Sequence, residues 1–257
     1  MARDDTERTG GVQSVERAFE LLEILASMGG TGALGELAAR ADLPQPTIHR
    51  LARTLLGMGY LRQLPNRHYS LGPRLIRLGE NAAQLIGMWS RPHLVELVER
   101  TGETANMALM DNDMAVYVAQ VPSPHSMRMF TEVGRRVYLH CTGVGKALLM
   151  QLPNETVRAL LARTGMPGAT ENTLTTPAAL LEDIELCRSR GYALDEGEQE
   201  VGVRCFAVPV PDAPSLTAIS ISGPAARVTL KSATAVTPLL KRVARDIASE
   251  FDKEAAV

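Results

Sequence analysis

Residues 34–61 read LGELAARADLPQPTIHRLARTLLGMGYL, and this stretch decides the fold of the N-terminal part of the chain. Apolar residues at helical spacing predict a short helix over its first eight residues. Pro44 cannot continue that helix but suits the opening of the next one. The second helix ends at Gly57 and Gly59, and its predicted inward face consists of Ile48, Leu51, Ala52 and Leu55. Two helices joined by a tight turn indicate a helix-turn-helix.

The flanking sequence extends this motif on both sides. Upstream, a helix is expected from Ser14, which can cap it, to the glycine pair at 29–30. Its apolar residues at helical spacing are Val15, Ala18, Phe19, Leu22, Leu25 and Ala26. Downstream, two short alternating runs at 60–62 and 68–71 flank a turn at 64–67, which predicts a β-hairpin. Three helices followed by a hairpin are the layout of a winged helix-turn-helix.

The second helix of the motif has a polar face that suits DNA. An α-helix fits the major groove of B-DNA, where its first turns reach the base edges. We expect these contacts from Gln45, Thr47, His49, Arg50 and Arg53. On the hairpin, Arg62 and Arg67 are expected to reach phosphate or the minor groove.

The charge distribution points the same way. The chain of 257 residues has 27 Lys and Arg against 29 Asp and Glu, a net charge of -2, which by itself does not indicate a nucleic-acid partner. Between Asp42 and Glu80, however, there is no acidic residue. The arginines of that window are Arg50, Arg53, Arg62, Arg67, Arg74 and Arg77. Such a local excess predicts a phosphate-binding face, with double-stranded operator DNA as the partner.

Pro73 opens a fourth helix with apolar residues in steps of three and four, which is the spacing of a helix–helix seam. The seam consists of Leu75, Leu78, Ala82, Leu85 and Trp89. We therefore expect self-association, as a homodimer or as a tetramer built from two dimers. The alternative is a helix packed on its own domain. The predicted domains are the winged helix-turn-helix at 12–72, the linker helix at 73–90 and a C-terminal domain at 91–252.

Beyond residue 91 the pattern alternates between helices and strands. Strands are expected at 104–110, 115–121, 127–133, 192–195, 203–210 and 216–221. Helices are expected at 94–100, 143–150, 154–163 and 177–191, with a long closing helix that carries Leu240 and Ile247 on its apolar stripe. Strands paired in meanders beside helices indicate an α+β class with an antiparallel sheet.

Several polar residues of this domain draw attention, although each of them alone is more typical of a structural role. The segment GVGKALL at 143–149 is not a phosphate-binding loop, because Lys146 is followed by Ala147 instead of Ser or Thr. A helix that opens on Gly143 does favour an anion at its N-terminus. Ser220 and Ser222 are two residues apart and therefore share one face of a strand.

Seven segments together resemble the isocitrate lyase regulator (IclR) family of transcription regulators, over about residues 12–250. In chain order they are SVERAFELLEILAS, the stretch quoted first, YSLGPRLIRLG, HLVELVERTGETANMALMD, LHCTGVGKALL and RGYALDEGEQEVGVRCFAVPV, followed by TAISISGP. Pro46 departs from the serine more common there, so a hydroxyl contact is absent at that position. The resemblance implies a winged helix-turn-helix, a linker helix and a GAF-like domain whose ligand changes DNA affinity.

The resemblance also implies an effector pocket in the C-terminal domain. The pocket positions at the helix start and on the strands correspond to Gly143, Val144, Asp195, Cys205, Ser220 and Ser222, with Met129 and Val137 as apolar lining. Val144 is bulkier than the alanine common in the family, which narrows the expected cavity. The segments ETANMAL, SMRMF and GKALL resemble the allantoin-pathway repressors, which implies a repressor and a small carboxylate effector such as glyoxylate or allantoate. An acidic ligand beside Asp195 requires that this carboxyl accept hydrogen bonds or be protonated.

Other functions remain open at this stage. One is an activator that responds to an aromatic acid. Another is a metal or redox sensor that uses His140, Cys141 and Cys205. Catalysis is not expected, because none of the five histidines lies in a nucleophile motif, and no catalytic residue, resident metal or cofactor is predicted. The sequence has neither a signal region nor an apolar run of membrane length, which predicts a cytoplasmic protein with no membrane partner.

Overall fold

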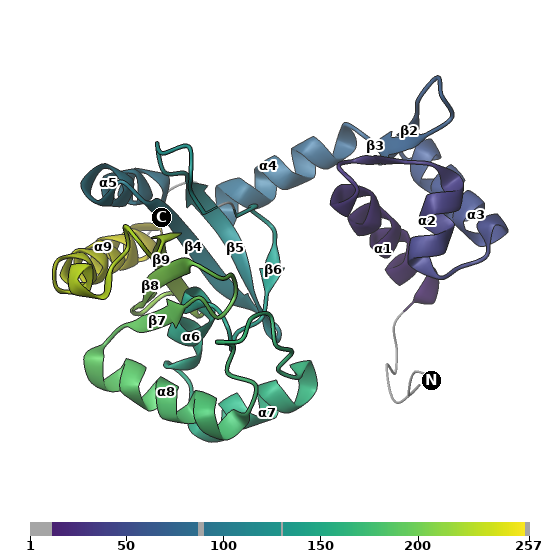
Figure 1. Ribbon diagram of the computed structural model, residues 1–257. Coiled ribbons are helices and arrows are strands. Elements are labelled where there is room, and N and C mark those ends of the chain that lie inside the picture. The colour runs from purple at the N-terminus through teal and green to yellow at the C-terminus, as the bar shows by residue number, and fades with distance from the viewer. Residues whose placement is uncertain (1–11, 87–89, 130, 255–257) are drawn as a thin grey trace. The chain divides into compact units, whose positions relative to one another are not determined.

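The computed structural model describes residues 12–86, 90–129 and 131–254 (Figure 1). The chain divides into two compact units, one up to Ala82 and one from Ala83 onward. The boundary falls inside helix α4 (Arg74–Ile86). The separate role predicted for residues 73–90 stays a prediction. No helix in the described part of the chain is both long enough and apolar enough to span a bilayer.

The N-terminal unit contains the three helices and the hairpin predicted from the sequence. Its elements are α1 (Gln13–Ser27), β1 (Thr31–Gly32), α2 (Leu34–Ala41), α3 (Gln45–Gly57), β2 (Leu61–Gln63) and β3 (Tyr69–Leu71), followed by the start of α4. One detail was wrong: α1 begins at Gln13 after Val12, so Ser14 lies inside the first turn and does not cap the helix. β1 was not expected; it pairs antiparallel with β3 and completes a three-stranded sheet in the order β1-β3-β2.

The core of this unit explains why these residues fold as a helix-turn-helix. Buried side chains from every helix and from the hairpin meet in one cluster, which includes Leu21, Leu25, Leu37, Ile48, Ala52, Leu55, Leu61 and Tyr69. Between α2 and α3 the chain turns at Asp42, which has a left-handed backbone with φ of 50°. At the tip of the hairpin, the side chain of Asn66 accepts the backbone N–H of His68 and closes the turn.

The C-terminal unit is an antiparallel sheet between two layers of helices. The sheet order is β6-β5-β4-β9-β8-β7, with β4 (Thr104–Asp111), β5 (Met114–Val121), β6 (Arg136–Val137), β7 (Ala193–Glu196), β8 (Val203–Val210) and β9 (Thr217–Pro224). Its helices are α5 (Arg91–Thr101), α6 (Gly143–Leu149), α7 (Asn154–Thr164), α8 (Pro177–Arg190) and α9 (Ala233–Glu254), with a short 3-10 turn at Leu230–Ser232. This arrangement confirms the predicted α+β class with flanking helices.

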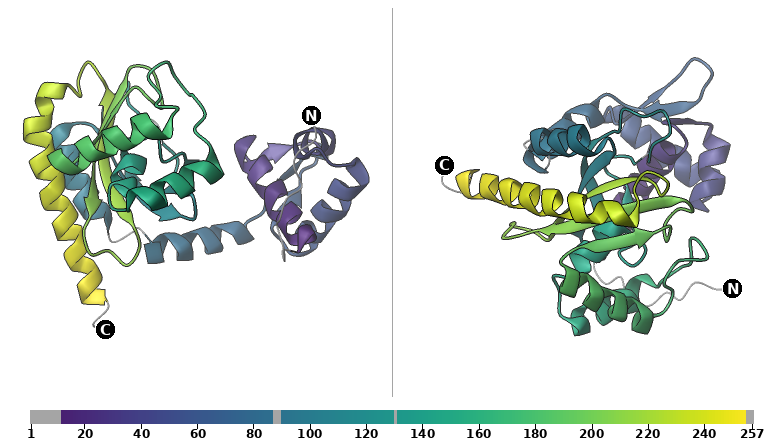
Figure 2. Two further views of the ribbon diagram at one scale, coloured as in Figure 1. Left: turned by 90° about the horizontal axis from the view of Figure 1, so that it is seen from below. Right: turned by 60° about the vertical axis from the view of Figure 1, so that its left-hand side comes forward.

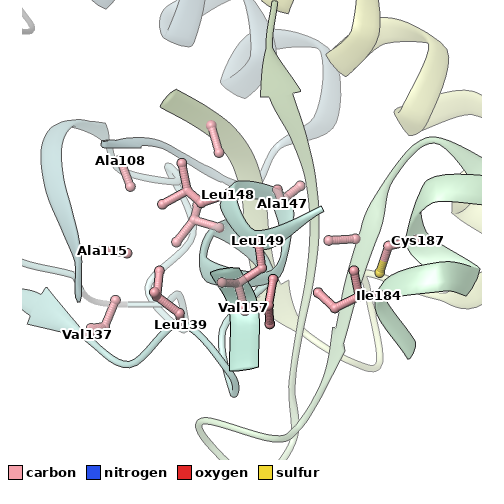
Figure 3. Packing of buried hydrophobic residues seen from close by; sticks show 14 of the residues in the cluster. Ala108, Ala115, Val137, Leu139, Ala147, Leu148, Leu149, Val157, Ile184 and Cys187 are labelled. Carbon is pink, nitrogen blue, oxygen red and sulfur yellow. The ribbon is translucent and has the colours of Figure 1, made fainter. Parts of the chain in front are cut away.

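Two hydrophobic clusters hold the sheet between its helices. On one face α5 and α9 pack against residues such as Met107, Phe206 and Ile219 (Figures 1 and 2). On the other face α6, α7 and α8 pack against Ala108, Ala115, Val137 and their neighbours, as Figure 3 shows around Leu148. The alternation of side chains along each strand therefore separates two cores, and the polar residues of interest lie on the α6 face.

The strand predicted at 127–133 was wrong. The described residues of this segment are irregular, and the strand of this region is β6 at Arg136–Val137 instead; Phe130 lies outside the described residues. The segment follows Pro122 and Pro124, which cannot donate to a strand ladder. It is attached to the sheet by a side chain, because the hydroxyl of Thr104 donates to the backbone carbonyl of Met129 at 3.2 Å.

Candidate functional site: an arginine-rich helix and a polar strip

The N-terminal unit presents the arginine face that the sequence predicts. On α3, Ile48, Ala52 and Leu55 are buried, whereas Gln45, His49, Arg50 and Arg53 are exposed and Thr47 is half-buried. On the hairpin, Arg62 and Arg67 are also exposed. Arg62 Nε donates to Ser70 Oγ at 3.0 Å, which steadies the guanidinium on the strand. The exposed surface of α3 and the hairpin therefore carries guanidinium groups, and residues 43–79, which include both elements, contain no Asp or Glu.

Arg74 has a different surrounding from the other arginines of this window. Its Nη1 donates to the carbonyl of Met58 at 2.8 Å, and its guanidinium lies 5.7 Å from the centroid of the Tyr60 ring. It therefore ties the start of α4 to the end of α3, which leaves Arg77 as the more available of the two for DNA.

In the C-terminal unit, strand register aligns the polar residues that the sequence predicts for an effector pocket. Asp195 on β7 lies opposite Cys205 on β8, which lies opposite Ser222 on β9, which in turn lies opposite Thr104 on β4. Two residues along β9, Ser220 lies opposite Asn106. All six are buried on one face of the sheet, and we call them the polar strip. Thr104 and Asn106 were not identified in the sequence, because only the β4–β9 pairing reveals them.

Hydrogen bonds join the members of the polar strip. Asn106 Nδ2 lies 3.4 Å from Ser220 Oγ and 3.5 Å from Ser222 Oγ. Its Oδ1 accepts from Gln120 Nε2 at 3.1 Å. Asn106 thus orients both serines, and Gln120 fixes which way the Asn106 amide faces.

The start of α6 closes over the polar strip. A Cβ atom on Gly143 would lie 2.6 Å from Cys205 Sγ, so only glycine allows the helix to approach this closely. Val144 is fully buried beside it. Thr142 caps the helix, since its Oγ1 accepts the N–H of Gly145 at 3.1 Å. One of the backbone N–H groups that were expected to bind an anion at this helix start is therefore already bonded to Thr142.

A small cavity of about 30 Å³ lies near the strip, since Met129, one of its lining residues, accepts a hydrogen bond from Thr104 of the strip. It is lined by Tyr117, Met129, Thr131, Arg135, Val137, Gln199 and Glu200. Met129 and Val137 were predicted here, and the other five were not. Thr131 Oγ1 is buried and has no hydrogen-bond partner among the described residues. Burial raises the pKa of the Tyr117 hydroxyl, and the nearby Cys205 and Asp195 raise it further. The volume suits about one or two water molecules, so a ligand would have to widen it.

Burial raises the pKa values of both titratable groups of the strip, the Asp195 carboxyl and the Cys205 thiol. Burial raises the pKa of Asp195 to about 7; hydrogen bonding from the Glu198 backbone opposes this shift, and the Glu198 carboxylate adds to it. Burial also raises the pKa values of Cys205 and Cys141 to about 12. Both cysteines are therefore thiols at neutral pH, which does not suit a nucleophile or a thiolate metal ligand.

The residues of the predicted metal or redox sensor do not form a metal site. Cys141 Sγ donates to Gln199 Oε1 at 3.0 Å, and a ring nitrogen of His140 lies 3.1 Å from the carbonyl of Pro167. Within residues 12–86, 90–129 and 131–254, no group of three or more His, Cys, Asp or Glu side chains could hold a metal ion.

The buried ion pairs of Lys146 were not predicted from the sequence. Its side chain is 1% exposed, and its Nζ lies 2.6 Å from Glu198 Oε1 and 2.8 Å from Asp183 Oδ2. Burial lowers the pKa of this ammonium, but the two carboxylates outweigh burial and the net shift is upward, so it stays charged. A lone lysine in an otherwise apolar helix was the available signal, since such a residue is rarely buried without a partner.

An arginine-rich winged helix-turn-helix in one unit, and a polar strip near a small cavity in the other, define a ligand-responsive DNA-binding regulator. Comparison with known families agrees. Residues 14–65 match the IclR helix-turn-helix domain, and residues 83–249 match the bacterial transcriptional regulator IclR C-terminal domain. The chain belongs to the IclR family of bacterial transcriptional regulators, so the resemblance seen in the sequence is confirmed.

Its relatives are regulators and not enzymes. The transcriptional repressor IclR of Escherichia coli K12 is 38% identical over 246 residues, which cover 93% of this chain and 90% of the relative. The repressor AllR of Escherichia coli K12, from the allantoin pathway, is 31% identical over 250 residues, covering 95% and 92%. Among solved structures, a transcriptional regulator from Rhodococcus sp. RHA1 is 28% identical, with a TM-score of 0.79 and coverage of 95% and 99%.

Proposed function

We propose that this regulator is a repressor that binds operator DNA as a homodimer in the cytoplasm and loses DNA affinity when a small carboxylate enters its C-terminal unit. One observation carries the effector part of this proposal. Strand register aligns Asp195, Cys205 and Ser222, and the start of α6 brings Gly143 against Cys205. The cavity near these residues is lined in part by Met129 and Val137. These residues come from distant parts of the chain, which supports a common ligand.

In the DNA-binding unit we assign base contacts to the exposed face of α3 and phosphate contacts to the hairpin. Gln45, Thr47 and His49 lie in the first turns of α3, where a helix in the major groove reaches the base edges. Arg50 and Arg53 follow on the same helix and serve either bases or phosphates. Arg62 and Arg67 on the hairpin serve the backbone or the minor groove.

The homodimer proposal rests on an apolar groove in the same unit. The groove has a volume of about 550 Å³ and lies between α1, α3 and the start of α4. Phe19 on α1 is 62% exposed beside it, and Leu78 on α4 is 47% exposed. Apolar side chains of this size gathered on one face mark an interaction site. The face extends beyond the predicted α4 seam, because α1 supplies five of the thirteen residues that line the groove.

A second copy of the chain is the occupant we assign to this groove. It offers both a protruding ring, Phe19, and a hollow lined by Leu22, Leu51 and Leu75, so the same surface on two copies can complement itself across a two-fold axis. Dimers of helix-turn-helix proteins bind two half-sites, so a dimer formed through the groove would present the exposed arginines of both copies to one operator. Of the other predicted seam residues, Ala82 is exposed, whereas Leu85 and Trp89 lie outside the described side chains. The step from dimer to tetramer stays a prediction.

We infer a small carboxylate as the effector from the size and charge of the site. Ser220 and Ser222 offer hydroxyl groups, and Asp195 is protonated over part of the neutral range, so it can donate a hydrogen bond to a carboxylate. A cavity of about 30 Å³ needs least widening for a ligand of a few heavy atoms. Glyoxylate fits this description better than allantoate or an aromatic acid, and AllR is among the relatives of the chain.

Calorimetry of the full chain with glyoxylate, allantoate and benzoate tests this assignment. We expect glyoxylate to bind the parent, and Asp195→Ala or Ser222→Ala to weaken it roughly 5- to 150-fold, because each change removes a hydrogen-bonding group worth about 1–3 kcal/mol. Ser189→Ala on α8 is the matched control, since that serine is exposed and bonds only to its own helix at Leu186. Glyoxylate binding that survives both site variants would contradict the pocket, and binding of benzoate alone would favour the aromatic-acid regulator.

The same titration should depend on pH. Above pH 7 Asp195 ionises and repels the carboxylate of the ligand, whereas below pH 7 it is protonated. The affinity for glyoxylate should therefore be higher at pH 6 than at pH 8. In Asp195→Ala this difference should disappear.

A further inference from the structure

Lys146 connects three elements through a buried ion-pair cluster. The lysine projects from α6, Asp183 comes from α8, and Glu198 comes from the turn after β7. Both Lys146 and Glu198 are almost fully buried, whereas Asp183 is partly exposed. A buried charge is tolerated only when it is paired, so the Lys146–Glu198 contact restricts where the turn can lie.

The turn that Glu198 anchors is also a wall of the candidate effector site. The backbone N–H of Glu198 donates to Asp195 Oδ1 at 2.8 Å. The next two residues, Gln199 and Glu200, line the cavity, and Gln199 accepts a hydrogen bond from Cys141. On the outer side, the hydroxyl of Thr173 donates to the Glu198 carbonyl at 2.7 Å. Moving Glu198 would therefore displace both the Asp195 carboxyl group and the cavity wall.

We propose that Lys146 is a positioning residue for the effector site: through Glu198 it holds the turn at 196–200 so that Asp195 and the cavity wall face the ligand. This inference rests on the effector site proposed above. Lys146 itself contacts Glu198 and Asp183 and acts through them. Its neighbours Val144 and Gly143 lie on the same short helix, so the helix that closes the strip also carries the cation that fixes the turn.

The charge of Glu198 also affects the effector site, because it changes the pKa of Asp195. The titratable groups that face Asp195 are Glu198 and Lys146, together with Tyr117, Cys141 and Cys205. Of these, the Glu198 carboxylate raises the pKa of Asp195 and the Lys146 ammonium lowers it. Removing the charge at 198 should therefore lower the pKa of Asp195. Its ionised form would then persist to lower pH and would repel a carboxylate ligand at neutral pH.

Glu198→Gln in the full chain tests the proposal, because glutamine keeps the shape of the side chain and a hydrogen bond to Lys146 but loses the charge. Glyoxylate titrations at pH 6, 7 and 8 should show about tenfold weaker binding at pH 7, with the fall in affinity moved to lower pH. Asp183→Asn is the matched control. It also removes one carboxylate from Lys146, yet it contacts no residue of the polar strip, so it should change thermal stability without moving the pH profile.

A second variant separates position from charge. Glu198→Asp keeps the charge but shortens the reach to Lys146, so it should weaken glyoxylate binding without moving the pH midpoint of the profile. The pKa of Asp195, followed by NMR of carbon-13-labelled aspartate without ligand, should fall in Glu198→Gln and stay in Asp183→Asn. An unchanged affinity in both Glu198→Gln and Glu198→Asp, with a parent that binds glyoxylate, would overturn the positioning role alone. A parent that binds no glyoxylate would instead overturn the proposed effector site.

Discussion

Raising the salt concentration from about 50 to about 200 mM is expected to weaken DNA binding by this regulator about 10³- to 10⁵-fold. Each phosphate that an arginine neutralises releases a counterion, so the logarithm of the affinity falls by about 0.9 per contact for each tenfold rise in salt. Arg50, Arg53, Arg62, Arg67 and Arg77 are exposed on one unit. Two copies of the chain would thus make about six to ten such contacts, which is the range that gives this loss.

Fluorescence anisotropy with a duplex at several salt concentrations measures the slope. Arg67→Ala should reduce its steepness by about two contacts per dimer, whether the duplex is an operator or a random sequence. Arg50→Ala should weaken operator binding more than random-sequence binding. Arg158→Ala on α7 is the control, because that arginine is exposed on the other unit. A slope close to zero in the parent would contradict the phosphate-binding face.

Phe19→Asp and Leu78→Asp are expected to separate the dimer and to weaken operator binding about 10²- to 10⁴-fold. A carboxylate placed in the apolar groove would be buried against a second copy without a partner, which opposes association. Without the dimer each half-site is bound independently, and the advantage of a linked second site is lost, which is worth a factor of this size.

Sedimentation velocity of the full chain, with the same operator titration, checks both parts of this expectation. Leu186→Asp serves as the matched control, because Leu186 is 59% exposed on α8 of the other unit. It should sediment and bind operator as the parent does. If Phe19→Asp and Leu78→Asp also behave as the parent does, α1 and α4 are not the dimer interface and the groove needs another explanation.

Local patterns in the sequence were sufficient for the DNA-binding unit. The helix-turn-helix follows from residues that are near one another in the chain: Pro44 between two helices, Ile48 and Ala52 at helical spacing, and a turn around Asn66. The β1 strand escaped prediction because a two-residue strand has no periodicity. The strand expected at 127–133 was wrong for the opposite reason: alternating residues are present, but the described residues of this segment form no strand.

The effector unit depended more on long-range pairing. The shared face of Ser220 and Ser222 follows from the two-residue repeat of a strand and could be predicted. The alignment of Asp195 with Cys205, and of Asn106 with Ser220, depends on the register between strands, which no single segment encodes. Lys146 escaped for a related reason, since its partners Asp183 and Glu198 are 37 and 52 residues away.

The effector is proposed to lower the affinity of the regulator for DNA, and one measurement tests this coupling directly. The measurement is the affinity of the full chain for the duplex upstream of its own gene, with and without saturating glyoxylate, for the parent and for Asp195→Ala. We expect glyoxylate to weaken DNA binding by the parent about 5- to 150-fold, the usual range of coupling between two sites. Asp195→Ala should bind the duplex as tightly as the parent without ligand and should not respond to glyoxylate. The same DNA affinity for the parent with and without glyoxylate would contradict the proposed coupling between effector and DNA binding.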